Sequence, residues 1–206
     1  MRHSISRDLY SYWNGLRGAR AAPDRSDIDP AAIRHILADT FILEIDGACR
    51  FPIRLCGTRM NALWQSEQKG VSFLDLWRRD ERRDVAAAVL TVIDGATPIV
   101  GGARARPLAA QASSAVTSAG EIDYELLLLP LRHFGKTHSR VIGSLAAFHE
   151  ANWFGKIAAA PLDLLSFRMI RAREFEGLPP PPSPRSQVPS RSPPRLIVFE
   201  GGKARS

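Results

Sequence analysis

The order of strand-like and helix-like segments limits, more than any other feature, the folds open to this chain of 206 residues. Residues 40–45 are mostly apolar or β-branched, Asp46-Gly47 is a favoured two-residue hairpin turn, and apolar and polar side chains then alternate over residues 51–56. Helix-like spacing follows between residues 58 and 94. Three further strand-like runs complete the order, at residues 97–106, 121–132 and 140–148.

The middle of the chain is predicted to hold three helical pieces. Thr58 can cap the first, the cluster from Phe73 to Trp77 is typical of one tight turn, and Asp80 can cap a longer helix. In the resulting order β-β-α-α-α-β-β-β, hairpins join neighbouring strands, which gives an antiparallel sheet with helices gathered on one face. We therefore expect an α+β fold with a five-stranded antiparallel sheet. Pro52 indicates that the second strand has an open edge.

The other face of this sheet is predicted to be covered. The runs 126–129 and 141–148 are apolar on both faces, whereas a sheet with one face in water would alternate. Residues 7–17 form a predicted amphipathic helix, capped by Ser6, that places Leu9, Trp13 and Leu16 at helical spacing. We expect this helix to cover the outer sheet face, either of its own chain or of a partner, and we predict Leu9, Trp13 and Leu16 as a dimer interface.

The C-terminal part of the chain differs in composition from the rest. Residues 151–170 still carry large apolar side chains and are expected to pack back on the domain. Eight of the fifteen prolines lie between Pro179 and Pro194, interleaved with Ser and Arg. Proline removes hydrogen-bond donors and favours an extended form, so residues 171–206 are predicted to be a disordered tail. The predicted folded domain is thus residues 1–170.

The net charge of +7 is concentrated in this tail. From Arg168 onward there are eight Lys and Arg residues against three Glu, whereas residues 1–167 hold twenty basic and eighteen acidic residues. A nearly neutral domain argues against a DNA-reading fold. The first residues have no apolar signal-peptide core, and the longest strongly apolar stretch, residues 126–129, is too short to span a membrane. We expect a cytoplasmic protein.

Several local motifs together resemble a known family. They are Asp8-Leu9-Tyr10-x-Tyr12-Trp13-x-x-Leu16-Arg17-Gly18, the helix start Ile28-Asp29-Pro30, Leu55-Cys56-Gly57-Thr58-Arg59, Phe73-Leu74-Asp75-Leu76-Trp77, and Leu126-Leu127-Leu128-Leu129-Pro130-Leu131. The set resembles the alphaproteobacterial single-domain PAS family of the PAS_5 type, formerly a domain of unknown function. The resemblance spans roughly residues 7–170. It implies a PAS fold, a cytoplasmic location and a signalling role, but no ligand or reaction common to the family.

No cofactor or metal is expected from the sequence. Cys49 lies beside the first hairpin turn, whereas the flavin-reactive Cys of light sensors lies on a later helix, and the predicted long helix has no His to hold haem. Two cysteines, Cys49 and Cys56, are too few for a structural zinc site. Both are expected to be reduced and half-buried.

No catalytic residues are expected either. Glu121, Asp123 and Glu125 share one strand face, and this alternation is typical of a solvated face rather than an acid–base pair. Gly101-Gly102 lacks the Lys and the helix start of a phosphate loop, so it indicates a β-bulge.

Three aromatic residues on the short helices, Trp64, Phe73 and Trp77, could line a pocket between those helices and the sheet. Core packing and the binding of a small apolar ligand both account for them. The sequence therefore favours a non-enzymatic sensory or adaptor protein that contacts other proteins and forms a homodimer. The alternative is a nucleic-acid-associated regulator that uses the basic tail, since phosphate binding needs only flexible positive charge.

Overall fold

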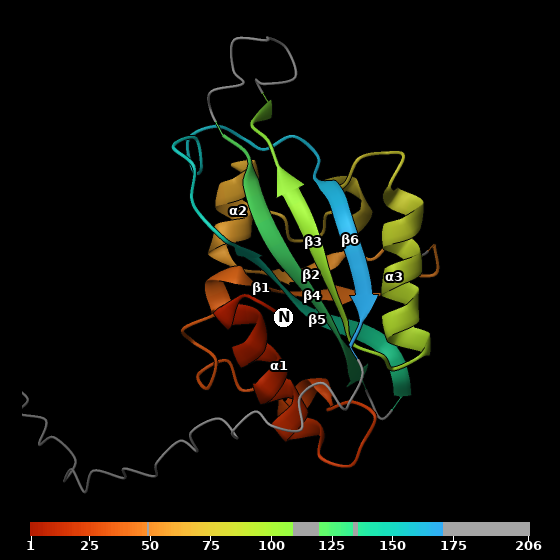
Figure 1. Ribbon diagram of the computed structural model, residues 1–206. Helices are drawn as coiled ribbons and strands as arrows, with labels where there is room; N and C mark the ends of the chain where they lie inside the picture. The colour runs from red at the N-terminus through yellow and green to blue at the C-terminus, as the bar shows by residue number, and fades with distance from the viewer. Residues whose placement is uncertain (49, 109–119, 134–135, 171–206) are drawn as a thin grey trace, which may run out of the picture.

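The computed structural model describes residues 1–48, 50–108, 120–133 and 136–170, so the predicted tail lies outside the described residues. Figure 1 shows a sheet with helices against it. The helices are α1 (Ser4–Arg17), α2 (Thr58–Trp64) and α3 (Arg82–Asp94), with short 3-10 turns η1 (Arg25–Asp27), η2 (Leu37–Asp39) and η3 (Phe73–Leu76). The strands are β1 (Thr40–Glu44), β2 (Ile53–Cys56), β3 (Ile99–Ala105), β4 (Ile122–His133), β5 (Lys136–Ala147) and β6 (Asp163–Met169).

The sheet is antiparallel throughout, in the order β2-β1-β5-β4-β3-β6. The α+β class is confirmed, but the expected number of five strands is wrong because β6 adds a sixth. β6 pairs with β3 from Ile99↔Met169 to Arg104↔Asp163, at the end of the sheet opposite β2. Residues 151–170 therefore do pack back on the domain, and the last part of this segment does so as a strand.

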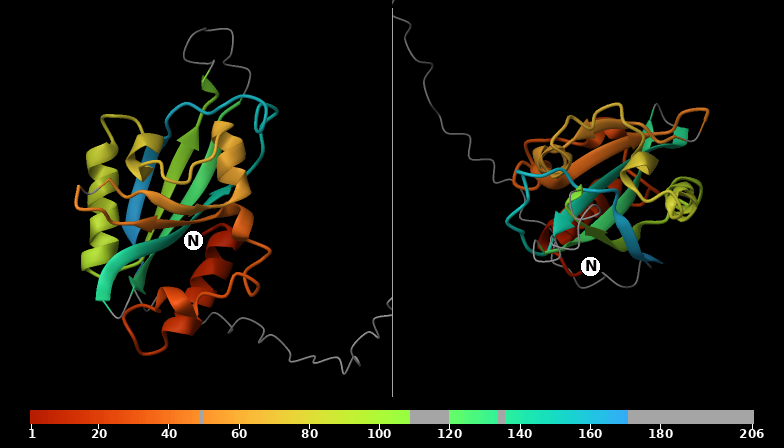
Figure 2. Two further views of the ribbon diagram at one scale, coloured as in Figure 1. Left: turned by 180° about the vertical axis from the view of Figure 1, so that it is seen from behind. Right: turned by 90° about the horizontal axis from the view of Figure 1, so that it is seen from above.

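Two apolar cores lie on opposite faces of the sheet. On the inner face, α3 and the short helices enclose a core that includes Leu126 and Leu128 of β4. On the outer face, α1 packs over Leu127 and Leu129 of the same strand. Figure 2 shows α1 and α3 on different sides of the strands. The apolar character of residues 126–129 on both faces thus has the predicted cause, and the N-terminal helix covers the sheet of its own chain.

The β2 edge of the sheet is covered by the chain that follows α2. Ile53 N donates to Val71 O (2.9 Å), and Phe73 N donates to Phe51 O (3.1 Å). Pro52, which has no N–H to donate, forms a bridge with Ser72 instead. β2 is therefore an edge strand, as Pro52 indicates, but its edge is closed and the prediction of an open one is wrong.

Helix ends differ from expectation at three places. The His3 side chain, not Ser6, caps α1 by accepting a hydrogen bond from Ile5 N (3.2 Å). Glu81, not Asp80, occupies the N-cap position of α3. Residues after Asp29 form turns rather than a helix, with bonds to the third residue back such as Ile36 N to Ile33 O (2.9 Å). Turns with three residues per repeat place Ile33 and Ile36 on the same side, and both isoleucines are buried without an α-helix.

Among the described residues, no helix combines the length and the apolar character needed to cross a membrane.

Candidate functional site

The predicted pocket residues on the short helices lie in the inner core. Phe73 and Trp77 are buried, with their rings 5.8 Å apart and edge-on, and Phe73 stacks on Phe41 at 5.3 Å. Trp64 is half-buried at the margin of this core. The Trp77 Nε1 atom has no hydrogen-bond partner among the described residues. The structure brings the three residues into one apolar cluster, and ligand binding there stays a prediction.

The predicted interface residues of α1 are used within the chain. Leu9 and Trp13 are buried against the outer sheet face, and Leu16 is half-buried beside them. The Trp13 Nε1 donates a hydrogen bond to Pro130 O (2.8 Å), which fixes the helix on β4. A dimer that keeps this packing cannot also bury Leu9 and Trp13 against a partner.

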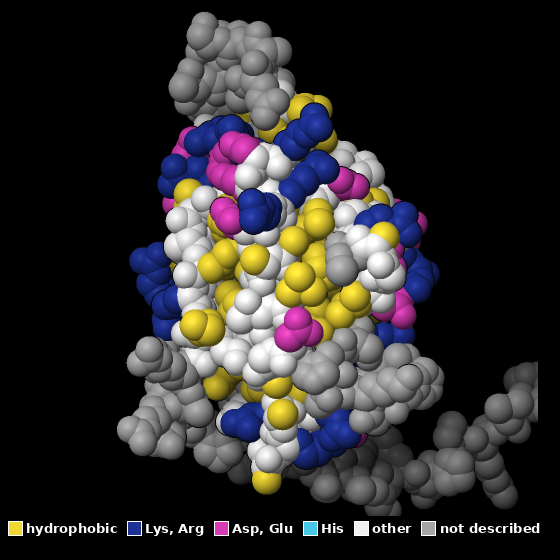
Figure 3. All heavy atoms as spheres, turned by 90° about the vertical axis from the view of Figure 1, so that its right-hand side faces the viewer, with side chains coloured by type: hydrophobic (Ala, Val, Ile, Leu, Met, Phe, Trp, Pro, Cys, Tyr) yellow, Lys and Arg dark blue, Asp and Glu magenta, His cyan; other side chains and the backbone are white. Residues whose placement is uncertain are grey.

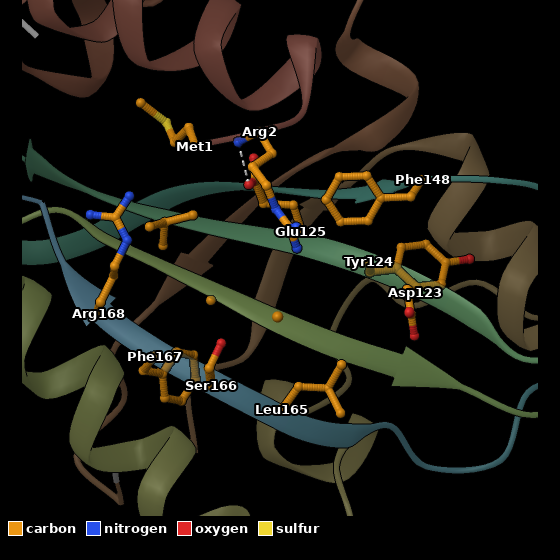
Figure 4. Close-up of a pocket in the computed structure, with 13 residues that line it drawn as sticks. Met1, Arg2, Asp123, Tyr124, Glu125, Phe148, Leu165, Ser166, Phe167 and Arg168 are labelled. Carbon is orange, nitrogen blue, oxygen red and sulfur yellow. Dashed lines mark hydrogen bonds between the residues drawn. The ribbon is translucent and has the colours of Figure 1, made fainter.

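Next to the N-terminal end of α1, the outer sheet face carries a groove of about 430 Å³. Its floor is formed by β3, β4 and β6, and its rim by the segment before α1 and by Phe148. Figure 4 shows Met1 and Arg2 above the sheet, with Leu165 and Arg168 of β6 on the other side of the groove. The lining is mixed, because it includes two cationic side chains, Arg2 and Arg168, and also exposed apolar side chains.

A buried carboxylate lines this groove. Glu125 of β4 is only 5% exposed, and it accepts hydrogen bonds from the backbone N–H groups of Arg2 (2.7 Å) and His3 (3.0 Å). The guanidinium of Arg2 lies over the Phe148 ring, 5.3 Å from its centroid (Figure 4). Glu125 thereby holds the start of α1 on the sheet. The expectation of a solvated Glu125 is wrong, because its partners lie more than a hundred residues away and no local pattern reveals them.

The other two acidic residues of this strand face make ion pairs. Arg104 of β3 donates from Nε to Asp123 (2.7 Å) and from Nη1 to Glu121 (2.9 Å). The hydrogen bond from Arg104 lowers the pKa of Asp123. Both carboxylates remain partly exposed, as expected for a solvated face, and the pairing with Arg104 favours the ionised form of Asp123.

The glycine pair of β3 marks a bulge, as predicted. The pairing of β3 with β6 shifts between Gly102 and Ala103, so Leu165 is the extra residue on β6. A Cβ on Gly101 would lie 2.6 Å from Phe167 Cδ1 and from Ser166 O, so β6 can approach only a glycine there. The bulge directs Leu165 towards the groove, where it is 48% exposed.

β6 is an edge strand, and no other strand of the described residues pairs with its side away from β3. Ile170 N donates to Pro98 O (2.8 Å), so by alternation the backbone groups of Phe167 and Met169 point away from β3. Within the described part of the chain, no hydrogen bond reaches those outward groups. Met169 itself is 59% exposed. Figure 3 shows hydrophobic side chains gathered on the side formed by α3 and β6, with charged side chains around them.

The family model of the PAS_5 type, described as a PAS domain, matches residues 1–146. The chain belongs to this PAS family. No curated protein and no solved structure is found to be significantly similar to the chain. The matched part of the PAS domain includes α1, the short helices, and the first five strands, whereas β6 lies beyond it. A PAS domain indicates a signalling or sensory role.

The PAS domain also holds a partly exposed ion-pair network around the buried Asp39. Arg59 of α2 pairs with Asp39 (3.2 Å) and with Glu150, and it lies over the Phe154 ring at 5.3 Å. Burial raises the pKa of Asp39 despite the pull of Arg59. Burial likewise raises the pKa of the nearby Tyr124, whose hydroxyl has no hydrogen-bond partner among the described residues. The network links η2, α2 and the chain after β5.

Metal ligands are not clustered in the part of the PAS domain that the structure describes, where no group of three His, Cys, Asp or Glu side chains could hold an ion. Cys56 is half-buried, and burial raises the pKa of its thiol to about 12. Only a very small fraction of this thiol is therefore ionised near pH 7, and it reacts slowly. Cys49 lies outside the described residues.

Proposed function

We propose that this PAS domain is a non-enzymatic sensory or adaptor protein that acts through protein–protein contacts made at the open edge of β6. The observation that carries the proposal is a pair of backbone positions on this edge strand, Phe167 and Met169, whose outward groups have no partner among the described residues. Such an edge accepts a further strand, whose backbone hydrogen bonds supply affinity.

The side chains around this edge support the same contact. Leu165 is exposed on the groove side of β6. Met169 pairs with Ile99, and directly paired residues share one face of the sheet. Since Ile99 belongs to the inner core, Met169 lies on the inner face, opposite to Leu165. A strand added beside β6 would therefore cover exposed apolar side chains on both faces of β6. The groove next to Leu165 offers further space for the side chains of a partner.

A second copy of the chain is the first partner to test. Two β6 strands can pair antiparallel about a two-fold axis, and each copy then contributes the same residues to the contact. This arrangement keeps α1 on its own sheet and leaves Leu9 and Trp13 buried as they are. The homodimer is thus proposed to form through β6 rather than through α1.

The test is to block the edge without disturbing the domain. Met169→Pro removes an outward N–H that no described residue uses, and natural edge strands carry proline in this way. Met169→Thr is the matched control, since it removes the apolar side chain and keeps the N–H. We expect wild type and Met169→Thr to sediment as dimers and Met169→Pro as a monomer with an unchanged far-ultraviolet spectrum. Dimers of equal affinity in all three proteins would contradict the proposal.

A further inference from the structure

A second pocket lies at the other end of the sheet, under the turns that follow α1. It has a volume of about 380 Å³ and lies between residues 25–38 and the outer face of β1, β2 and β5. The sheet order places β2 and β6 at opposite ends, so this pocket is separate from the β6 edge.

The floor of this pocket is a row of three apolar side chains. Ile42 of β1 pairs with Leu55 of β2 on one side and with Ile142 of β5 on the other. All three residues line the pocket. Ile28 and Ile33, both buried, line it from the turns above. The walls are therefore almost wholly aliphatic.

The row changes from buried to exposed as it approaches the edge. Ile42 and Ile142 are buried, whereas Leu55 remains 38% exposed. A large apolar side chain thus lies open to solvent at the mouth of an aliphatic pocket. An apolar ligand in the pocket would remove this surface from water, which is favourable.

One charged side chain lines the pocket, that of Arg25. Its acidic neighbours are paired elsewhere, since Arg20 binds both Asp24 (3.0 Å) and Asp27 (2.8 Å). The guanidinium of Arg25 makes no ion pair or hydrogen bond with any residue in the described ranges. A cation without a carboxylate partner, at an aliphatic pocket, favours a ligand that is apolar along its length and anionic at one end.

We propose that this pocket binds a small amphipathic anion, a medium-chain carboxylate, with its chain over Ile42 and Leu55 and its carboxylate at Arg25. The inference does not rest on the β6 contact, because the two sites share no residue. It gives the PAS domain a chemical input on the outer face of the sheet, apart from the aromatic cluster of the inner core.

The test is calorimetric titration of the full chain with carboxylates of increasing length, from hexanoate to dodecanoate, below their micelle concentrations. Each added methylene buried should tighten binding by about fourfold until the pocket is full. Decanol, which has the chain without the charge, should bind at least about tenfold more weakly than decanoate. Absence of saturable decanoate binding, or equal affinity for decanol, would overturn the proposal.

Matched variants locate the site. Arg25→Gln and Leu55→Gln should each weaken decanoate binding by about tenfold or more. Arg34→Gln removes an exposed cation of the same segment, and Leu165→Gln removes the exposed leucine of the other groove, so both should leave binding unchanged. Loss of binding in Leu165→Gln but not in Leu55→Gln would overturn the location.

A second measurement leaves the pocket residues unchanged, so its result cannot be caused by misfolding of a pocket variant. Cys56 lines the pocket, so in a Cys49→Ser background bound decanoate should slow alkylation of Cys56 in proportion to occupancy. An alkylation rate that stays constant while calorimetry reports saturation would place the ligand elsewhere and overturn the proposal.

Discussion

The indole Nε1 of Trp13 donates a 2.8 Å hydrogen bond to the carbonyl oxygen of Pro130, so the N-terminal helix is attached to the centre of its own sheet. Trp13 is also buried in the outer core with Leu129. Helix and sheet are therefore stabilised by the same contact, and removal of the side chain affects both.

Trp13→Ala is accordingly expected to lower the free energy of unfolding by about 3–5 kcal/mol, through lost burial and the cavity left behind. Because the contact lies within one chain, the loss should be the same at every protein concentration. Urea unfolding followed at several concentrations measures this. A transition midpoint that rises with concentration only in the wild type would instead show that α1 bridges two chains.

Glu125 is expected to control how firmly α1 is held at its start. Glu125→Gln replaces one accepting carboxylate oxygen with an NH2 group, which can only donate, so the backbone N–H of either Arg2 or His3 is left unpaired. The expected loss is about 1–3 kcal/mol, with faster hydrogen exchange confined to the first turn of α1. Asp123→Asn, on the same strand face but partly exposed, is the control and should change this exchange little. Equal protection in all three proteins would contradict the role of Glu125.

The element order and the covered outer face were predictable from sequence because local spacing determines both. β6 was not, because its bulge at Leu165 interrupts the alternation by two that identifies a strand. Leu164 packs against the inner core while its neighbour Leu165 lines the outer groove, so two adjacent leucines give no strand pattern.

The sites were less predictable than the fold for a related reason. Trp64, Phe73 and Trp77 were recognisable as one group, since they belong to neighbouring short helices. The contact of Glu125 with Arg2, and the row from Leu55 through Ile42 to Ile142, join segments far apart in the chain. Such contacts depend on strand pairing, which a single sequence does not display residue by residue.

The burial of Asp39 predicts a pH dependence of stability. Because burial raises the pKa of Asp39 in the folded state, the folded chain binds this proton more tightly than the unfolded chain. The stabilisation of the folded state by proton binding at Asp39 is therefore fully present below the ordinary pKa of 3.8. It is lost as the pH rises through the raised pKa. The groups facing it are Arg59, Glu150 and His3.

Urea unfolding between pH 4 and pH 7 tests this against Asp39→Asn, which has no proton to lose. The stability of the wild type relative to the variant should fall as the pH rises. Asp80→Asn is the control, because Arg78 lowers the pKa of Asp80 and so gives the opposite sign, with a small effect at an exposed site. Parallel curves for wild type and Asp39→Asn would refute the prediction.

The last prediction concerns where the folded domain ends, since the family match stops at residue 146 and the sheet does not. Ala159 N donates to Leu63 O and Leu162 N to Leu76 O, both at 2.8 Å, so the chain after β5 is hydrogen-bonded to α2 and η3 before it enters β6. Deletion of residues 147–206 removes these bonds and exposes the side of β3 that β6 covers.

That deletion is expected to abolish cooperative unfolding or leave the protein insoluble. Deletion of residues 177–206 keeps β6 and the buried Ile170, so its melting temperature should stay within about 2 °C of the wild type. The shorter deletion also removes a net charge of +4 from the total of +7. A salt titration of DNA binding by the wild type and by this variant therefore tests the nucleic-acid alternative. A drop of several degrees on deleting 177–206 would show that the domain extends beyond residue 170, because only docked residues contribute to the melting temperature.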